Sequence, residues 1–315
     1  MKKVVFTLLL TIFALYGRGQ ESQTGYNFLR LPVSAHAAAL GGDNITIIDD
    51  DPSLGFSNPA LAASVSDMTI GVNYMNYMSG ANVGSATFNK VVNDKLTWAV
   101  GAEYINYGSM KEVDENGVQT GTFSANDIAV SGTLTYLLLK NVVGGITPKF
   151  IYSALGSYNS MAIGVDLGLN WYEPDHDWSV SLVAKNLGGQ LKAYDDKYEK
   201  MPIDVQAGVS KRLGSSPLRL SLTLVDLTHY NYRFANHIDL GLDVLLSDNI
   251  WIGGGYNFRR VDEMKIEGDD GDESSHMAGL SLGFGINLDR FKLSLAYGKY
   301  HVSSGSLLLN FAYTL

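Results

Sequence analysis

The stretch from Met161 to Trp171 constrains the fold of this chain more than any other part of its sequence. Every second residue in it is apolar and the residues between them are small or polar, so an extended backbone has one apolar and one polar face. Its length of about eleven residues is what a tilted β-strand needs to cross a bilayer. The stretch therefore predicts a membrane-spanning strand, and the chain repeats this pattern from Met68 onwards.

The N-terminus has the order of segments found in secretory signal peptides. Lys2 and Lys3 provide positive charge, the run from Val4 to Tyr16 is apolar, and small residues follow up to Gly19. The apolar run is too short for a transmembrane helix. We expect cleavage near Gly19, so residues 1–19 are interpreted as a signal peptide that is absent from the mature protein.

The composition is that of an exported β-protein. The 34 glycines and 18 tyrosines favour strands and turns over helices. Cysteine is absent, which excludes disulfides, a thiol nucleophile and thiolate metal ligands. The net charge of −9 argues against nucleic acid as a partner. The mean hydropathy of +0.02 is typical of soluble domains, but lipid-facing and lumen-facing residues cancel in this average when the chain forms a barrel.

Residues 20–67 precede the predicted strands and do not alternate. The alanine-rich run Ser34–Leu40 suits a short helix that the Gly41-Gly42 pair would end. Asp51-Pro52 can open a second short helix, with the aspartate as its N-cap. Two interpretations are open: a periplasmic tail, or a compact plug folded into a barrel lumen. We favour the plug, because a segment this rich in Ala, Leu and Ile needs a place to bury them.

Residues 68–315 contain fourteen stretches with strand-like patterns. They predict an all-β fold, a transmembrane antiparallel β-barrel of about 14 strands, preceded by an N-terminal hatch or plug segment. The predicted strands are approximately 68–78, 84–90, 96–107, 126–138, 141–153, 160–172, 177–187, 202–212, 217–227, 236–246, 249–259, 276–288, 291–300 and 306–315.

The connections between these strands alternate in length. Tight turns follow the second, fourth, sixth, eighth, tenth and twelfth strands, and long links follow the third, seventh and eleventh, over 108–125, 188–201 and 260–275. Outer-membrane barrels have short periplasmic turns and longer outer loops. We therefore expect the long links at the cell surface, and the even number of strands leaves both termini on the periplasmic side.

Tryptophan and tyrosine positions fit this orientation. Trp98, Trp171 and Trp178 lie beside periplasmic turns with outward parity, whereas Trp251 has inward parity. Aromatic side chains prefer the two interfaces of a bilayer, so a second belt is expected at the outer rim. Its predicted members are Tyr77, Tyr107, Tyr152, Phe258 and Tyr300.

Ionisable residues of both signs occur at inward positions in the middle of strands. They would be costly against lipid and are favourable in a polar lumen, so we interpret them as paired or hydrated lumen residues and not as catalytic groups. The alternating last strand, which ends at Leu315, is expected to close the barrel against the first. The inward residues are Glu103, Lys149, Asp166, Lys185, Asp204, Arg219 and Asp243.

No motif in the sequence supports an enzyme. The six histidines are dispersed without metal-ligand spacing. Gly279–Gly283 matches the nucleophile-elbow pattern but lies within a predicted strand, and Ser247–Asn249 matches one element of the penicillin-binding set without its nucleophile. The acidic stretch Glu267–Glu273 could collect a calcium ion, although a solvated loop is the favoured alternative. We predict no catalytic residue and no metal site.

Three motifs of the N-terminal segment resemble the FadL-like outer-membrane barrels. Ser34-Ala-His-Ala-Ala-Ala-Leu-Gly-Gly42, Asp49-Asp-Asp51 and Asn58-Pro-Ala60 are similar to the N-terminal signature of those families, including the Asn-Pro-Ala of their hatch. The resemblance implies a fourteen-stranded barrel with the N-terminal segment inside it. The hatch residues that it assigns are Asn58, Pro59, Ala60, Gly41, Gly42, Asp49, Asp50 and Asp51.

Three further motifs resemble the PorQ family of the type IX secretion system. They are Gly25-Tyr-Asn-Phe-Leu-Arg-Leu-Pro32, Phe123-Ser-Ala-Asn-Asp127 and Lys185-Asn-Leu-Gly188. The resemblance implies a non-catalytic outer-membrane subunit of the cell-surface attachment complex of a Gram-negative bacterium. It implies a PorZ-like surface protein as partner, beside a PorU-like sortase, a PorV-like barrel and outer-membrane lipids. No cofactor is implied, apart from a lipid or detergent molecule in the lumen.

Two functions follow from these patterns. In the first, the barrel anchors a surface partner through its outer loops. In the second, suggested by the FadL likeness, it transports hydrophobic small molecules across the outer membrane. A third interpretation, a soluble periplasmic sandwich, fails if the protein partitions with the outer membrane. The predicted partner-binding residues of the first function are Tyr194, Asp195, Asp196, Asp269, Asp270, Asp272, Glu112 and Asp114.

Overall fold

The computed structural model describes residues 24–78, 80–214, 216–247, 249–264, 266–267, 273–274, 277–302 and 304–315. The expected signal peptide lies outside these residues. Most of the acidic stretch considered as a calcium site lies outside them too.

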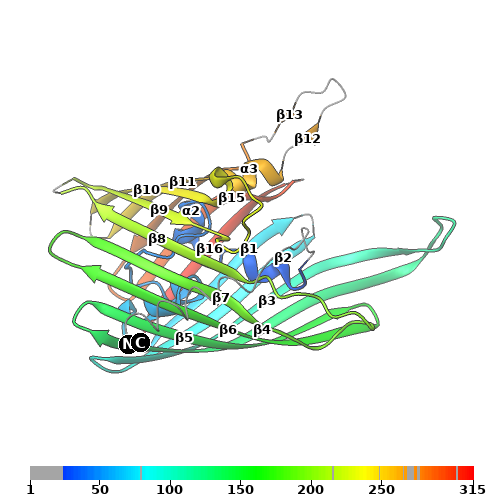
Figure 1. The fold of residues 1–315 in the computed structure, drawn as a ribbon, viewed down its shortest axis with the longest axis horizontal. Coiled ribbons are helices and arrows are strands. Elements are labelled where there is room, and N and C mark those ends of the chain that lie inside the picture. The colour runs from blue at the N-terminus through cyan, green and yellow to red at the C-terminus, as the bar shows by residue number, and fades with distance from the viewer. Residues whose placement is uncertain are drawn as a thin grey trace.

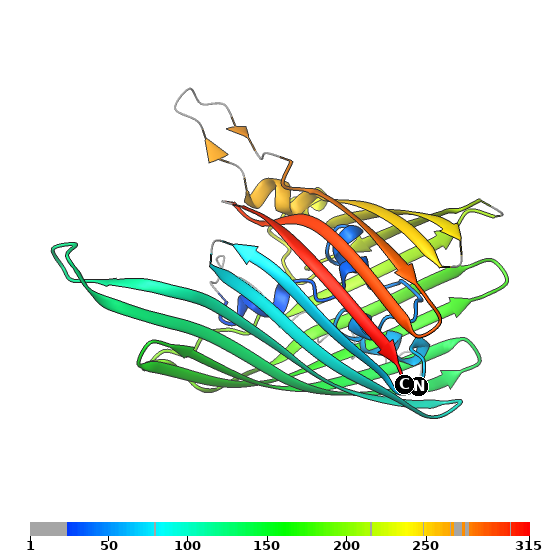
Figure 2. The same ribbon diagram turned by 180° about the vertical axis from the view of Figure 1, so that it is seen from behind.

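Fourteen antiparallel strands close into a barrel (Figures 1 and 2). The last strand pairs with the first, from Thr69 opposite Thr314 to Asn76 opposite Leu307, as the final alternating stretch predicts. The predicted barrel of fourteen strands is therefore confirmed. The barrel strands are β1 (Thr69–Met78), β2 (Ala81–Asn93), β3 (Leu96–Val113), β4 (Gln119–Leu139), β5 (Val142–Leu155), β6 (Tyr158–Glu173), β7 (Trp178–Lys192), β8 (Asp204–Arg212), β9 (Leu218–Leu224), β10 (Ile238–Ser247), β11 (Ile250–Asn257), β14 (Leu280–Asn287), β15 (Phe291–His301) and β16 (Ser304–Thr314).

Side chains alternate between the outside of the barrel and its lumen. In β6, Ile163, Leu167 and Leu169 are 44–48% exposed, whereas Asp166 and Asn170 are buried. An apolar outer face and a polar inner face are what a membrane-spanning barrel needs.

Aromatic side chains follow the predicted parity at one rim and not at the other. The three tryptophans beside the short turns are 36–39% exposed and Trp251 is 3% exposed, as predicted. Tyr77, Tyr107 and Tyr300 instead pack against the buried core. The expected outer belt is wrong for these three residues, because their strands reach the outer rim with inward parity.

At one end of the barrel, short links join neighbouring strands. The chain also finishes there, where the Leu315 N–H donates to the Met68 carbonyl at 3.2 Å. The C-terminus lies at this end in both ribbon views (Figures 1 and 2). Since short turns face the periplasm in outer-membrane barrels, we assign this end to the periplasm and the opposite end to the cell surface.

The outer end differs from the prediction in three places. Residues 108–125 are not a loop, because β3 and β4 continue beyond the barrel as a two-stranded ribbon with a short turn. We call residues 109–124 the outer ribbon. The link 225–237 was missed as a long connection and contains η4 (Phe234–His237). The predicted strand end at 258–259 is part of helix α3 (Phe258–Glu263), which precedes a hairpin of β12 (Ile266–Glu267) and β13 (Glu273–Ser274).

Residues 24–67, which we call the N-terminal segment, form four short helices. The Ser34 hydroxyl caps α2, and the backbone turns after Leu40 through Gly41 with a φ of 107°. Asp51 caps η2 with proline at its first position, as the sequence indicates. Within the described residues, no helix is long and apolar enough to cross a membrane. The helices are η1 (Asn27–Arg30), α2 (Ala35–Ala39), η2 (Pro52–Phe56) and η3 (Pro59–Ser64).

The N-terminal segment lies within the ring of strands and runs from one end to the other (Figures 1 and 2). Thr24 forms a parallel bridge with Lys200, which lies at the outer end after β7. At the periplasmic end, the Asn89 amide donates to the Val65 carbonyl at 3.3 Å. Helix α2 packs against β14 and β15, and η3 packs against β4 and β5 across the ring. The segment therefore contacts opposite walls of the barrel.

Two glycines of the wall allow this close contact. A Cβ atom at Gly145 would lie 2.5 Å from the Pro59 carbonyl carbon, and one at Gly255 would lie 2.2 Å from the Gly41 nitrogen. Only a residue without a side chain lets the segment's backbone approach the wall at these positions.

Candidate functional site

The Asn58-Pro59-Ala60 motif fixes the N-terminal segment in the periplasmic half of the lumen. Asn58 is fully buried, and its Oδ1 accepts from the Ala60 N–H at 3.0 Å, which caps η3. Its Nδ2 donates to the Ile45 carbonyl at 3.0 Å and lies 3.2 Å from the Ser181 hydroxyl of β7. One amide therefore joins two parts of the segment to each other and to the barrel wall.

Asp50 and Asp51 hold the turns of the same region. Asp50 accepts from the Ser66 N–H at 2.7 Å and forms an ion pair with Lys292 of β15. Asp51 accepts from the Ser34 hydroxyl at 2.9 Å. The two carboxylates therefore connect the start and the end of the segment and fasten it to β15.

His36 joins Asp49, the remaining aspartate of the predicted hatch residues, to the barrel wall. Its Nδ1 lies 3.1 Å from Asp49 Oδ2, and its Nε2 lies 3.0 Å from Asp243 Oδ1. Asp243 also pairs with Arg219 at 2.7 Å. The imidazole stacks on Trp251 at 3.7 Å between ring centroids. Carboxylate oxygens only accept hydrogen bonds, so an imidazolium with two N–H groups satisfies both aspartates and gains from the indole face.

The Gly41-Gly42 pair turns the chain beneath α3. Both glycines have left-handed backbone conformations, with φ of 107° and 109°. The Gly41 carbonyl accepts from Arg260 Nη2 at 2.7 Å and from Asn257 Nδ2 at 3.3 Å. The Arg260 guanidinium lies 4.6 Å from the centre of the Tyr300 ring. The end of β11 and helix α3 thus hold the segment through the Gly41 carbonyl.

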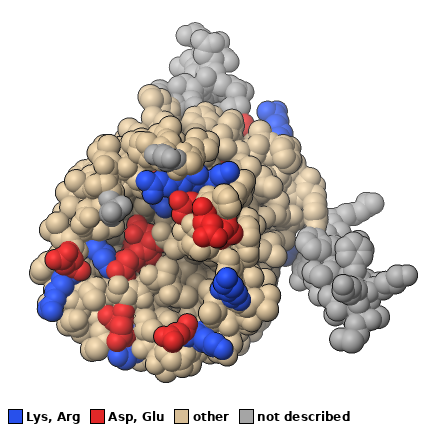
Figure 3. All heavy atoms as spheres, turned by 90° about the vertical axis from the view of Figure 1, so that its left-hand side faces the viewer, with Lys and Arg blue, Asp and Glu red and all other residues tan. Residues whose placement is uncertain are grey.

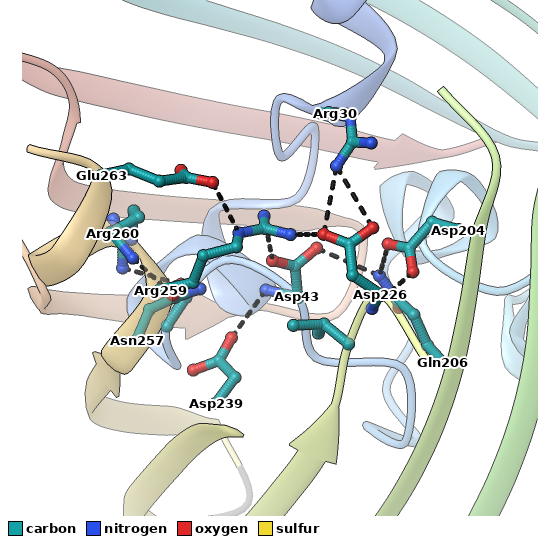
Figure 4. A network of polar contacts seen from close by, with 12 residues as sticks. Arg30, Asp43, Asp204, Gln206, Asp226, Asp239, Asn257, Arg259, Arg260 and Glu263 are labelled. Atoms are coloured by element: carbon teal, nitrogen blue, oxygen red, sulfur yellow. Dashed lines mark hydrogen bonds and ion pairs between the residues drawn. The ribbon is translucent and has the colours of Figure 1, made fainter. Parts of the chain in front are cut away.

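A network of charged side chains lies above this turn (Figure 4). Arg30 Nη1 lies 3.2 Å from Asp226 Oδ2, and Arg259 also pairs with Asp226. Arg259 lies 3.9 Å from Asp43, whose N–H donates to Asp239 at 3.0 Å. The side chains point toward one another from the segment, from α3 and from the ends of β9 and β10 (Figure 4). They connect the start of the segment to the outer end of the barrel.

The lumen wall carries a further charge cluster, formed by four of the predicted inward residues. Lys149 and Asp166 pair at 2.7 Å, and Glu103 is buried beside them with Lys185. A cavity of about 40 Å³ separates this cluster from the segment. That volume holds a few water molecules. A second cavity, of about 180 Å³, lies at the outer mouth between Arg259, Arg260 and Tyr300.

The predicted partner-binding residues fall into three groups. Glu112 and Asp114 lie on the outer ribbon and are exposed, as are Asp195 and Asp196 in the link after β7. Tyr194 turns back toward the barrel, where its hydroxyl contacts Ser153, and burial raises the pKa of this hydroxyl to about 12. This side chain is therefore less available to a partner than expected. Three residues lie outside the described part of the chain: Asp269, Asp270 and Asp272.

The periplasmic face carries acidic and basic groups side by side. Figure 3 looks onto this end, where Asp and Glu side chains lie beside Lys and Arg side chains and protein atoms occupy the interior of the ring. At its edge, Lys90 pairs with Asp67 at 3.0 Å, and this hydrogen bond lowers the pKa of the Asp67 carboxyl. The mixture of signs gives this face no single strong field for a charged ligand.

These contacts bind the segment to the wall at several heights. No group of three or more His, Asp or Glu side chains in the described residues could hold a metal ion. The sequence prediction did not find His36 or Arg259 as members of the site. His36 lies within the Ser34–Gly42 motif, but that motif does not indicate its contact with Asp243, and Asp226 is likewise distant in sequence from Arg259.

The sequence that forms most of the barrel strands matches a protein-family model. Residues 130–310 match the model of a family described as "Type IX secretion system membrane protein PorP/SprF". The chain belongs to this PorP/SprF family. The fold and the family together identify it as an outer-membrane β-barrel of a type IX secretion system. The match does not show whether the chain has the PorQ role that the sequence motifs suggest. That role stays a prediction.

Solved structures support the barrel fold over nearly the whole chain. A FadL homologue of Pseudomonas aeruginosa has a TM-score of 0.53 and 11% identity, covering 89% of this chain and 97% of its own. The toluene transporter TodX of Pseudomonas putida has a TM-score of 0.55 and 11% identity, with 92% and 97% covered. The CymD monoaromatic hydrocarbon channel has a TM-score of 0.54 and 14% identity, with 89% and 96% covered. Such low identity shows the fold alone. No curated protein matches the sequence.

Proposed function

We propose that this chain is a non-catalytic barrel subunit of the type IX cell-surface attachment complex, with the role implied by the PorQ resemblance. Its outer end anchors a PorZ-like surface protein beside a PorU-like sortase and a PorV-like barrel. Cargo release and attachment are carried out by the sortase. The N-terminal segment acts as a hatch that keeps the lumen closed.

The filled lumen is the observation that carries this proposal. Buried contacts fasten the N-terminal segment to opposite walls, and the cavity left beside Glu103 and Lys149 is about 40 Å³. A barrel filled in this way has no room for a folded cargo domain. Membership of a secretion family then favours a role at the surface of the barrel over a role as a conduit.

The outer end supplies groups that suit a protein partner. Glu112 and Asp114 of the outer ribbon and Asp195 and Asp196 of the link after β7 are exposed. Exposed carboxylates on two outer elements favour a partner with a basic surface, because complementary charge speeds association and selects against acidic partners.

The test shortens two outer elements, the outer ribbon and the link after β7, and keeps the barrel. One variant replaces residues 111–120 by Asn-Gly, a second replaces residues 195–198 by Gly-Ser, and a third combines both. A matched control shortens the periplasmic turn at residues 174–176. We expect the surface partner to move from the cells to the medium in the combined variant and to stay attached in the control. The partner is quantified by surface biotinylation and mass spectrometry.

Retention of the partner by the combined variant would contradict the anchor function, provided that the barrel is present and folded. Heat-modifiable migration in gel electrophoresis measures the folded barrel in each strain. Arg260 is kept in every variant, because it holds the Gly41 carbonyl at 2.7 Å.

A FadL-like transporter is the second candidate. It is favoured by the likeness in fold to a protein described as a toluene transporter, which covers 92% of this chain. Transport through the lumen requires the N-terminal segment to move, because the two cavities beside it, of about 40 and 180 Å³, are small. Uptake of toluene and of a long-chain fatty acid should fall on deletion of the gene if this function holds. Unchanged uptake of both would exclude it.

A further inference from the structure

The outer ribbon has an edge that no described strand covers. β2 pairs with β3 only as far as Asn106, and β5 pairs with β4 only from Ala125. Beyond these points β3 and β4 pair only with each other, from Ser109 opposite Ser124 to Val113 opposite Gln119. The ribbon extends away from the barrel in both ribbon views (Figures 1 and 2). Within the described residues, neither long edge of the ribbon pairs with another strand.

The hydrogen bonds of the ribbon show which backbone groups face outward. The Ser124 carbonyl accepts from the Gly156 N–H at 3.0 Å, on the side away from β3. Backbone groups alternate in direction along an antiparallel pair, so the opposite residue Ser109 and then Lys111 turn their N–H and C=O groups away from β4. Consistently, the Glu112 carbonyl faces β4 and lies 3.4 Å from the Thr120 hydroxyl. Among the described residues, the outward backbone groups of Ser109 and Lys111 on the β3 edge have no backbone hydrogen-bond partner.

The charges around this edge indicate what could pair with it. The tip of the ribbon carries Glu112, Asp114 and Glu115 against Lys111, and all four side chains are exposed. Val113 is 57% exposed and provides apolar contact area. A second copy of this chain would bring the same three carboxylates and be repelled. A strand that carries Lys or Arg would be attracted instead.

We propose that the β3 edge of the outer ribbon, residues 109–113, binds an extended strand bearing Lys or Arg from the surface partner by adding it to the ribbon. Main-chain hydrogen bonds supply affinity in this mode and side chains supply selectivity. Residues 109–113 span roughly 17 Å, the length of about five strand residues. The proposal rests on the proposed anchor function and names how the partner is held.

The test uses the purified full chain and a synthetic peptide that alternates Lys and Val, with a matched peptide that alternates Glu and Val. Fluorescence anisotropy measures binding, and hydrogen exchange measures protection of the amides in residues 109–113. We expect the Lys peptide to bind and to protect these amides, and the Glu peptide to bind at least tenfold more weakly.

Two matched proline variants identify the edge. Lys111→Pro removes an outward N–H on β3, and Thr122→Pro removes the equivalent group on β4, because these two residues are opposite each other. We expect Lys111→Pro to weaken binding of the Lys peptide about tenfold and Thr122→Pro to change it less than twofold. Removal of the lysine charge would by itself strengthen binding of a basic peptide. Weaker binding by this variant therefore reports the loss of the backbone N–H.

Equal effects of the two prolines, or no protection of residues 109–113, would overturn the proposal. Its failure is distinguishable from failure of the anchor function. If replacement of residues 111–120 releases the partner from cells although Lys111→Pro binds the peptide normally, the anchor stands and strand addition is rejected. If the partner stays on cells that carry the combined replacement of residues 111–120 and 195–198, the anchor is rejected whatever the peptide does.

Discussion

The two ends of the barrel close in different ways. At the periplasmic end, tight turns join neighbouring strands and the N-terminal segment fills the ring, with Asn58 fully buried among its hydrogen-bond partners. At the outer end, the strands stop at different heights, and the ribbon of β3 and β4 extends into solvent. Asn58 is buried at the periplasmic end, whereas the outer ribbon presents exposed backbone and charge at the other end.

This difference separates stability from recognition. Changes at the sealed end leave buried groups unpaired or force atoms together, so they should affect folding. Changes in the outer ribbon and in the link after β7 alter exposed groups and should affect partner binding alone. Four variants, in order of decreasing expected effect, test this division.

Gly145→Leu should have the largest effect. Its side chain would meet the Pro59 carbonyl carbon, 2.5 Å from the new Cβ, and the Ala60 nitrogen at 2.6 Å, both of which are backbone. We expect no heat-modifiable folded barrel. Gly132→Leu on the neighbouring strand is the control, because nothing lies within 4 Å of its Cβ position. A folded Gly145→Leu barrel with a protected segment would contradict the close contact.

Arg219→Met should follow. It removes the guanidinium partner of the buried Asp243 carboxylate at 2.7 Å and leaves His36 as its remaining partner, so the cost is roughly 3 kcal/mol, the low end for breaking a buried ion pair. Urea unfolding followed by tryptophan fluorescence measures the loss. The matched change at an exposed pair is Lys90→Met, which removes the partner of Asp67 and should leave the midpoint unchanged. Equal losses in the two variants would show that the lumen pair is not buried.

Asn58→Ala should destabilise the barrel by about 1–3 kcal/mol, because it removes the cap of η3 and leaves the Ile45 carbonyl without its donor. Asn116→Ala in the exposed turn of the outer ribbon should change stability by less than about 0.5 kcal/mol. Denaturant titration of both variants gives the comparison. If the two losses are equal, the motif does not fasten the segment.

The smallest effect on folding is expected for Asp195→Lys with Asp196→Lys. Both residues are exposed in the link after β7, so the unfolding midpoint should not move. Association with a basic partner should slow, and the difference from the unmodified barrel should shrink at high salt, because exposed charges are screened. Surface plasmon resonance over a salt series measures both. A shift of the midpoint without a change in association would reverse the division between the two ends.

The barrel could be predicted because lipid imposes its own pattern on the sequence. Each strand that crosses the membrane must alternate apolar and polar residues, as Met161–Trp171 does. This alternation can be recognised in a single strand, without knowing which strands pair with it. The outer ribbon escaped prediction for the same reason, since residues 109–124 lie outside the membrane and need no apolar face. Pairing between Ser109 and Ser124 is visible only in three dimensions.

The site could be predicted only where its contacts are local. The Asp51-Pro52 start of η2 follows from neighbouring residues, and so does the end of α2 at Gly41. The link between His36 and Asp243 joins residues 207 positions apart, and nothing near either one signals it. The inward parity of Asp243 predicted a lumen side chain without naming its partner.

The most direct test of the account concerns the path of the N-terminal segment from the outer end to the periplasmic end. The chain has no cysteine, so single cysteines report their surroundings without background. A membrane-impermeant maleimide added to intact cells should label Thr24→Cys and the outer-loop control Tyr198→Cys, and should label Ala63→Cys only after the outer membrane is opened. Labelling of Ala63→Cys but not of Thr24→Cys or Tyr198→Cys in intact cells would contradict the assigned orientation. Labelling of Tyr198→Cys alone, with Thr24→Cys reached only after the membrane is opened, would contradict the path.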